Sequence, residues 1–246
     1  MVKVMNNFNE ELWKFFDMVV EGENFCLTRF GDGELSIING NNFDVLSENP
    51  TEFDYFSEKE EYLTSKQMLQ DSFSNNKKGY YKGIPCHCCI VGDESLSIYD
   101  SFSDKQYLTW ANVFVNSNYQ DFNNYFSSIV KERKVYLISH FDAEVAQLTF
   151  DIEGHWKIGS NAWINNLEII QEVKDYIEVM EIKDAVFLVA GGPFANIFCS
   201  ELWNENTDNT YIDIGSTLDV YLYGKPTRHY HLPYHEDAKK DCVWFE

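Results

Sequence analysis

The chain has 246 residues, of which 44% are hydrophobic and 16% aromatic, a composition that supports a substantial folded core and excludes a disordered chain. Its 19 basic and 40 acidic residues give a formal net charge of −21, which leaves no excess of Lys or Arg to neutralise phosphates and argues against a nucleic-acid partner. No apolar run is long enough to cross a bilayer and no secretory signal opens the sequence, so we expect a cytoplasmic protein without a membrane span, folded as a single domain over residues 1–246.

An amphipathic helix is predicted over residues 7–20, because large apolar side chains recur there at helical spacing. It leads into the stretch NFCLTRFGDGELSIING, around which the chain is organised. Residues 25–28 favour a strand, Gly31 and Gly33 permit a tight backbone turn, and the apolar pattern of residues 35–38 favours a helix that packs back onto a sheet.

The polar residues of this turn follow the carboxyl end of the strand, where open α/β sheets bind their ligands. Asp32 and Glu34 can face one point in a glycine-relaxed turn, and one or two carboxylates with substrate phosphate oxygens are typical ligands of Mg²⁺ and Mn²⁺. Arg29, beside the same turn, could take a phosphate with its planar guanidinium. A purely structural interpretation stays open, in which Gly31 or Asp32 caps the helix and Glu34 supplies half of a capping box.

The acidic, aromatic stretch of residues 41–61 lacks regular periodicity and could be an ordinary surface loop or a flap over a site; we favour the loop. A helix is expected over residues 58–73 and a short extended segment over residues 80–85.

The six cysteines do not have the spacing of a disulfide framework, and reduced thiols fit better. Three of them lie in the CHCC segment, Cys86 to Cys89, which we expect to continue a core strand. On a strand, Cys86 and Cys88 would lie on one face and His87 and Cys89 on the other, so a shared zinc site would need a turn. No second Cys/His pair has a recognisable spacing, and we favour small buried cysteines over zinc.

The middle of the chain repeats a strand, a polar turn and a helix. The ANVFV segment, residues 111–115, is strand-like, and KVYLISHFDAEVAQLTF predicts a strand that runs into a turn and a helix. His140 follows this second strand and could act as general base or contact a diphosphate; equally, it could be an edge residue beside Asp142 as helix cap. A packing helix is expected over residues 161–179.

The clearest buried strand is DAVFLVA, residues 184–190, whose continuous apolar character is typical of a parallel sheet covered on both faces. It ends at Gly191 and Gly192, where a glycine turn before a helix could offer backbone N–H groups to a phosphate. The segment TYIDIGSTLDVYL adds another strand, followed by Asp213 and Asp219. Asp213 could contact a donor, complete a metal environment through water, act as base, or only cap the turn.

Three histidines gather near the end of the chain, His229, His231 and His235. On an extended segment His229 and His231 would share a face, so a transition-metal pair is conceivable, although no third ligand has a defined spacing. The cluster could instead form the rim of an acceptor or nucleotide site.

The string TRFGDGE resembles the signature of the GT-D type of glycosyltransferase, in which an R-F-G-D-G-E segment carries a metal-associated D-x-E motif. The segments VFLVAGGPFANIFCSEL and TYIDIGSTLDVYL look like the later strand, G-P turn, helix and D-I-G segment of the same family. These matches cover the first part of the chain and about its last quarter. The resemblance implies a Rossmann-like α/β fold, with a mostly parallel sheet and helices on both faces. It also implies transfer of a sugar from a nucleotide-diphosphate donor to a hydroxyl of a glycan acceptor.

The sequence is therefore interpreted as a glycosyltransferase that depends on Mn²⁺ or Mg²⁺, because a divalent cation would offset the acidic field that repels a diphosphate. We assign the metal to Asp32 and Glu34, and the base of an inverting reaction to His140 or Asp213. The expected substrate-binding residues are Arg29, Gly31, Gly33, Gly191, Gly192 and Asp219. A metal-dependent phosphohydrolase or nucleotidyltransferase, or a non-catalytic nucleotide- or glycan-binding module, remains an alternative. The sugar, the acceptor and the oligomeric state are left open.

Overall fold

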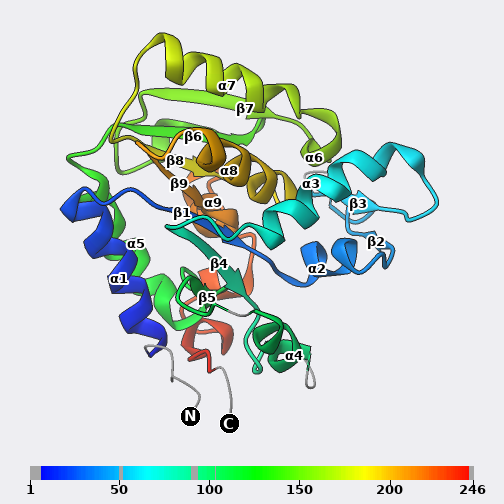
Figure 1. Cartoon of the computed structure of the whole chain (residues 1–246). Coiled ribbons are helices and arrows are strands. Elements are labelled where there is room, and N and C mark those ends of the chain that lie inside the picture. The colour runs from blue at the N-terminus through cyan, green and yellow to red at the C-terminus, as the bar shows by residue number, and fades with distance from the viewer. Residues whose placement is uncertain (1–6, 50–51, 90–93, 103, 244–246) are drawn as a thin grey trace.

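The computed structural model describes residues 7–49, 52–89, 94–102 and 104–243. Its centre is a seven-stranded sheet in the order β5-β4-β1-β9-β8-β6-β7, and every pair of neighbouring strands is parallel. The strands are β1 (Cys26–Arg29), β4 (Tyr80–Ile84), β5 (Leu108–Trp110), β6 (Val135–His140), β7 (Gly154–Ile158), β8 (Val186–Val189) and β9 (Thr210–Asp213). Helices cover both faces (Figure 1), which confirms the predicted Rossmann-like α/β fold.

The helices are α1 (Phe8–Glu21), α2 (Asp32–Ile38), α3 (Leu63–Ser74), α4 (Glu94–Ser101), α5 (Tyr119–Val130), α6 (Ala162–Asn165), α7 (Glu168–Val179), α8 (Pro193–Glu205) and α9 (Asp219–Leu222). The expected helix over residues 7–20 is thus present as α1. The side chain of Asn7 accepts a hydrogen bond from the N–H of Glu10, and Glu10 returns one to Asn7, which forms a capping box. Gly22 ends the helix at φ 76°, a conformation that favours glycine.

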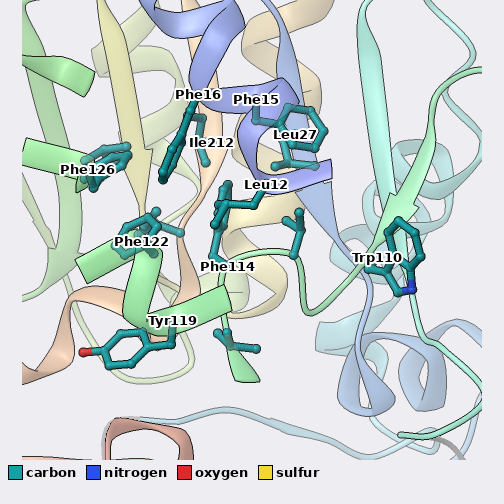
Figure 2. Close-up of a cluster of buried hydrophobic side chains, with 14 of the residues drawn as sticks. Leu12, Phe15, Phe16, Leu27, Trp110, Phe114, Tyr119, Phe122, Phe126 and Ile212 are labelled. Carbon is teal, nitrogen blue, oxygen red and sulfur yellow. The ribbon is translucent and has the colours of Figure 1, made fainter. Parts of the chain in front are cut away.

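Two apolar layers sandwich the sheet, and the strands feed both by alternation. In β8, Val186 and Leu188 point to the layer formed with α1 and α5, while Phe187 and Val189 point to the layer formed with α7 and α8. The first layer is rich in aromatic rings from α1 and α5 (Figure 2). Each fully buried side chain of this size contributes about 1.5–3 kcal/mol to folding. The continuous apolar run of β8 is therefore explained by its burial on both faces.

The predicted strand over residues 111–115 is wrong. The strand in this region is β5, and after it Ala111 donates to Ile84 O at 2.9 Å before the chain turns, with Val113 N–H bonded to Trp110 O at 3.1 Å. The segment is apolar because it is buried, not because it is extended. Burial without periodicity does not distinguish a strand from a buried turn.

The region after β6 also differs from the prediction. The expected helix is reduced to a short 3₁₀ turn at Val145–Gln147, and the chain continues into β7, an edge strand that was not predicted. Its sequence GHWKI is largely half-buried and carries no clear alternation. The single helix expected over residues 161–179 is divided into α6 and α7.

Residues 43–49 and 52–55 are not the irregular surface loop that we favoured. Two short strands, β2 (Phe43–Asp44) and β3 (Asp54–Tyr55), pair in antiparallel fashion. Asn161 fixes Glu52 and Asp54 to the main body: its side chain donates to Asp54 Oδ1 at 2.7 Å, and its backbone N–H donates to Glu52 O at 3.1 Å. The hairpin therefore has a defined position over the sheet edge.

The CHCC segment is a turn and not the predicted continuation of a core strand. Strand β4 ends at Ile84, before Pro85, and the N–H of Cys89 then bonds to Cys86 O at 3.1 Å. Pro85 has no N–H to extend the ladder, so the chain leaves the sheet here. The turn brings the thiols of Cys86, Cys88 and Cys89 to one side, where they meet Cys242.

Among the residues that the structure describes, none of the helices is both long and apolar enough to span a membrane.

Candidate active site

A cleft of about 1050 Å³ opens at the carboxyl edge of the sheet. Residues at the ends of β1, β6 and β7 and residues that follow β8 and β9 reach it, and the β2–β3 hairpin and residues 222–228 form further walls. After β1 the chain turns into α2, which packs in the layer of α7 and α8, whereas after β9 it turns into α9, which packs in the opposite layer. The cleft therefore lies where the connections that follow the neighbouring strands β1 and β9 leave to opposite faces of the sheet, which is the usual ligand position in such sheets.

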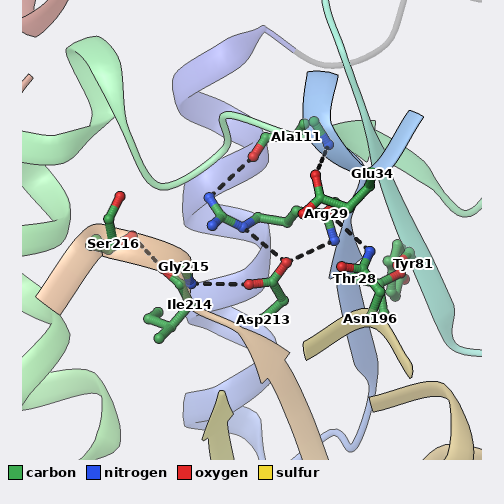
Figure 3. A network of polar contacts seen from close by, with 12 residues as sticks. Thr28, Arg29, Glu34, Tyr81, Ala111, Asn196, Asp213, Ile214, Gly215 and Ser216 are labelled. Atoms are coloured by element: carbon green, nitrogen blue, oxygen red, sulfur yellow. Dashed lines mark hydrogen bonds and ion pairs between the residues drawn. The ribbon is translucent and has the colours of Figure 1, made fainter. Parts of the chain in front are cut away.

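Arg29 is fixed at the floor of the cleft by Asp213 (Figure 3). Asp213 Oδ2 lies 3.6 Å from Arg29 Nε and accepts a hydrogen bond from the Arg29 backbone N–H at 3.2 Å, while Oδ1 accepts from Gly215 N–H at 3.0 Å. Arg29 Nη1 donates to Ala111 O at 3.2 Å. Burial raises the pKa of Asp213, and the positive charge of Arg29 opposes that rise.

Arg29, which we expected to bind a phosphate, and Asp213, which we proposed as a base, differ in their access to the cleft. Arg29 lines the cleft, whereas Asp213 is buried behind it and is not among the lining residues. Both carboxylate oxygens of Asp213 already accept backbone N–H groups. Asp213 is thus placed to orient Arg29 and the turn at Gly215, but it does not itself line the cleft.

Asp32 and Glu34 both line the cleft, in the first turn of α2. Asp32 is exposed, whereas Glu34 is half-buried and accepts a hydrogen bond from Gly31 N–H at 2.9 Å. Burial raises the pKa of Glu34 to about 7, and the nearby carboxylates of Asp213 and Asp32 add to the rise. The capping interpretation and the ligand interpretation are therefore compatible, because Oε2 of Glu34 caps the helix while its other oxygen is not needed for that bond.

Two glycines, Gly33 and Gly192, allow Phe53 of the hairpin to pack closely on the turns after β1 and β8, and Gly191 lies equally close to Ile158. A Cβ on Gly33 or on Gly192 would lie 2.8 Å from the Phe53 ring, and one on Gly191 would lie 2.8 Å from Ile158 Cδ1. Gly192 has φ 54° and precedes Pro193 at the start of α8. Within the described part of the chain, the backbone N–H groups of Gly191 and Gly192 donate no hydrogen bond, so both are available to a ligand.

His140 is buried at the end of β6 and lines the cleft. Its Nδ1 accepts a hydrogen bond from Asp142 N–H at 3.3 Å, while Nε2 is buried and has no partner among the described residues. Burial lowers the pKa of His140, although Asp142 opposes this, so the ring is neutral at pH 7. Because Nδ1 accepts, the proton is on Nε2, which is then a donor.

Asp219 faces the cleft from the start of α9 and accepts a hydrogen bond from Thr227 Oγ1 at 2.5 Å. Burial raises its pKa to about 6. Two further cleft residues were missed by the sequence analysis, Glu52 of the hairpin and Arg228 of the C-terminal segment, which form an ion pair with each other. Neither lies in a motif or a periodic segment, and only the tertiary fold brings them together.

The cleft carries more negative than positive side chains. Its acidic residues are Asp32, Glu34, Glu52, Asp142, Glu144 and Asp219, and its basic residues are Arg29, Lys225 and Arg228. Arg228 is already paired with Glu52. An anionic ligand would therefore meet an unfavourable field unless a cation entered with it.

The donor set fits a hard divalent cation that is completed by the ligand. The carboxylates of Asp32 and Glu34 both line the cleft and are oxygen donors of the kind that Mg²⁺ and Mn²⁺ prefer. Two carboxylates alone leave most coordination positions to water or phosphate oxygens.

The histidine cluster differs from the prediction. His229 and His231 do not share a face: His231 is buried, with Nδ1 accepting from Thr227 N–H at 3.1 Å and from Arg228 N–H at 3.2 Å. His229 instead stacks on His235, with ring centroids 4.2 Å apart, and both approach Asp237. None of the three histidines lines the cleft.

Neither a protein-family model nor a curated protein matches the sequence. Solved structures match the fold. A glycosyltransferase of the domain of unknown function 1792 type, from Streptococcus sanguinis, aligns over 96% of this chain and 93% of its own with a TM-score of 0.54 and 14% identity. Another structure of that domain, described as a distinct glycosyltransferase fold, aligns over 87% and 80% of the two chains with a TM-score of 0.53 and 15% identity. The chain thus has the fold found in this class of glycosyltransferase.

Proposed function

We propose that the protein is a metal-dependent glycosyltransferase that moves a sugar from a nucleotide-diphosphate donor to a hydroxyl of a glycan acceptor. The observation that carries the proposal is the convergence of Asp32, Glu34, Arg29 and the Gly191–Gly192 turn on one cleft at the strand ends. The turns after β1 and β8 come from distant parts of the chain, and both offer groups suited to a diphosphate. The fold shared with known glycosyltransferases supports the same class of reaction.

In this proposal Asp32 and Glu34 hold Mn²⁺ or Mg²⁺, which would neutralise charge on the departing nucleotide diphosphate. Arg29, oriented by Asp213, binds a phosphate oxygen, and the N–H groups of Gly191 and Gly192 bind others. His140 donates through Nε2 to the donor, because the hydrogen bond at Nδ1 leaves the proton on that atom.

Asp219 is our candidate for the base that takes the acceptor hydroxyl's proton in an inverting transfer. It lines the cleft, and its raised pKa of about 6 makes it a stronger base than an ordinary carboxylate while leaving it ionised at pH 7. This role was expected for His140 or Asp213. In neutral His140 the single ring proton is on Nε2, so this atom cannot accept the proton of the acceptor hydroxyl. Asp213 lies behind Arg29 and does not line the cleft, which leaves Asp219 as the candidate base.

The test is calorimetric binding of a panel of nucleotide sugars with Mn²⁺, with Mg²⁺ and with chelator. The variants are Asp32→Ala and, as a control, Asp17→Ala, an exposed acid on α1 away from the cleft. We expect one donor to bind only with metal, and this binding to be lost in Asp32→Ala alone. Absence of donor binding in a folded protein under every metal condition would overturn the proposal. Metal-dependent release of phosphate or free sugar without transfer would favour a hydrolase.

A further inference from the structure

Four cysteine thiols meet outside the cleft. Cys86, Cys88 and Cys89 come from the turn after β4, and Cys242 comes from the C-terminal segment. Their sulfur atoms all lie within 4.8 Å of one another, and none of the four forms a disulfide. The proposed function uses none of these residues.

The sulfur geometry has the dimensions of a metal-thiolate centre. A tetrahedral site with Zn–S bonds of about 2.3 Å has sulfur atoms about 3.8 Å apart. The Cys86–Cys88, Cys88–Cys89 and Cys89–Cys242 sulfur distances are 3.3, 4.0 and 4.0 Å. A disulfide would need about 2.05 Å, so all these separations are too long for a bond and close to those of a shared ligand sphere.

The surrounding groups are donors, as a cluster of thiolates requires. Asn112 Nδ2 lies 3.1 Å from Cys89 Sγ, and Asn116 Nδ2 lies 3.2 Å from Cys242 Sγ. Asn116 adopts a left-handed backbone with φ 56°, which a residue other than glycine holds at a cost. Lys240 brings a positive charge to Cys89. N–H groups and a cation directed at sulfur stabilise thiolates and orient ligands around a metal.

From this geometry we infer that Cys86, Cys88, Cys89 and Cys242 form a structural Zn²⁺ site. Four cysteine ligands arranged as a tetrahedron suit zinc, and a closed set of four leaves no position open for catalysis. Binding replaces the four thiol protons with one zinc ion, and the protons go to the solvent. The centre carries two net negative charges, of which Lys240 neutralises one, while the two asparagine amides stabilise the thiolates by hydrogen bonds.

The site would fasten the C-terminal segment to the body of the protein. Near Cys242, Ser117 N–H donates to Lys240 O at 3.1 Å and Ser117 Oγ donates to Asp241 Oδ1 at 2.7 Å. Further upstream the same segment supplies Thr227 and Arg228 to the cleft. Zinc at Cys242 would therefore hold the far end of a segment whose near end forms part of the cleft wall.

The first test is the metal content of the full chain, purified under reducing conditions without a metal-affinity step. Mass spectrometry of the metals is expected to find one zinc per chain. Replacement by Co²⁺ is expected to give the sulfur-to-cobalt charge-transfer and ligand-field absorption of a tetrahedral thiolate site. Iron in place of zinc, no bound metal after incubation with Zn²⁺, or disulfides among the four cysteines would overturn the inference.

The variants are Cys89→Ser, at the exposed member of the cluster, and Cys199→Ala, a matched control at a buried cysteine of α8. Loss of a ligand should lower the zinc affinity at least about tenfold, since loss of an outer-shell partner alone costs that much. Cys199→Ala should keep the zinc stoichiometry of the wild type.

A second measurement separates metal binding from ordinary packing. With zinc bound, Cys89→Ser should lower the melting temperature and make the C-terminal segment more susceptible to proteolysis. In chelator, wild type and Cys89→Ser should behave alike. A difference that persisted unchanged in chelator would assign the role of Cys89 to packing and exclude the zinc site.

Discussion

The guanidinium of Arg29 lies directly against the α-carbon of Gly215, so that a Cβ at this position would overlap Arg29 Nη2. Gly215 also has φ 52°, and its N–H fixes Asp213, the partner of Arg29. Gly215 thus has two roles: it adopts the backbone conformation of the turn, and it leaves space for the guanidinium of Arg29.

Replacing Gly215 by alanine should therefore displace Arg29. We expect Gly215→Ala to weaken donor binding about tenfold to a hundredfold, the value of a charge-assisted hydrogen bond, with a loss of about 1–3 kcal/mol in stability from the left-handed backbone. Calorimetry and denaturant unfolding measure the two effects. Gly22→Ala is the matched control, because Gly22 has φ 76° but open space around its α-carbon. Equal donor affinity in the two variants would refute the proposed role of Arg29.

Glu34 should couple metal binding to proton release. Its pKa of about 7 means that it is substantially protonated at pH 6, so a cation must displace a proton there. We expect the metal affinity to rise between pH 6 and 8 and calorimetry in buffers of different ionisation enthalpy to detect a released proton at pH 6. Glu144→Gln, at another cleft carboxylate, should retain this behaviour, whereas Glu34→Gln should lose it. Proton release unchanged in Glu34→Gln would exclude Glu34 as the ligand.

Asp219 should control the rate of transfer and not the binding of the donor. Asp219→Asn is expected to lower kcat by about 10²–10⁴, the range for loss of a general base, with little change in donor affinity. In the wild type the rate should increase with pH through about 6 as Asp219 ionises. Steady-state kinetics across pH provide the measurement, and Glu144→Gln is the control because Glu144 also lines the cleft. A wild-type rate in Asp219→Asn would exclude Asp219 as the base and favour His140.

His231 should make the folded state sensitive to acid. Burial lowers its pKa to about 4, and its Nδ1 already faces two backbone N–H donors, so an added proton would be repelled. Between its unfolded pKa of about 6.5 and about 4, the unfolded chain binds this proton and the folded chain does not. Stability should therefore fall with falling pH in this window, by about 2–3 kcal/mol from this residue.

The measurement is the free energy of unfolding at several pH values for wild type and His231→Asn. The variant is expected to be less stable at pH 7.5 but to lose less stability on acidification. His229→Asn, in the exposed part of the same segment, should keep the wild-type slope. Parallel pH profiles for wild type and His231→Asn would contradict this account.

The sequence was most informative where chemistry and local structure coincide. Arg29, Asp32 and Glu34 directly follow a short apolar strand, and Gly191 and Gly192 end the most apolar run of the chain, so one rule about strand ends placed them at the same edge. Asp213 follows the same rule, yet it is buried behind Arg29, because spacing alone does not reveal which of two neighbours faces solvent.

Other features depend on contacts between distant segments. Cys242 lies far from the CHCC segment, so no ligand spacing could indicate the fourth sulfur. Glu52 and Arg228 meet only because the hairpin and the C-terminal segment close over the same edge. Strand β7 gave no signal since it lies at the edge of the sheet, where half-exposed side chains need no apolar alternation.

The pairing of β1 with β9, in which Cys26 lies opposite Tyr211, has a consequence for how the protein is made. Strand β1, which ends at Arg29, is separated from its neighbour β9 by most of the chain, and loop closure over such a distance is slow. During translation β1 can pair with β4 on one edge, but its other edge stays unpaired until β9 has left the ribosome. A nascent chain or a C-terminal truncation that ends before residue 210 therefore has no assembled cleft, and its unpaired central strand is an exposed template for aggregation.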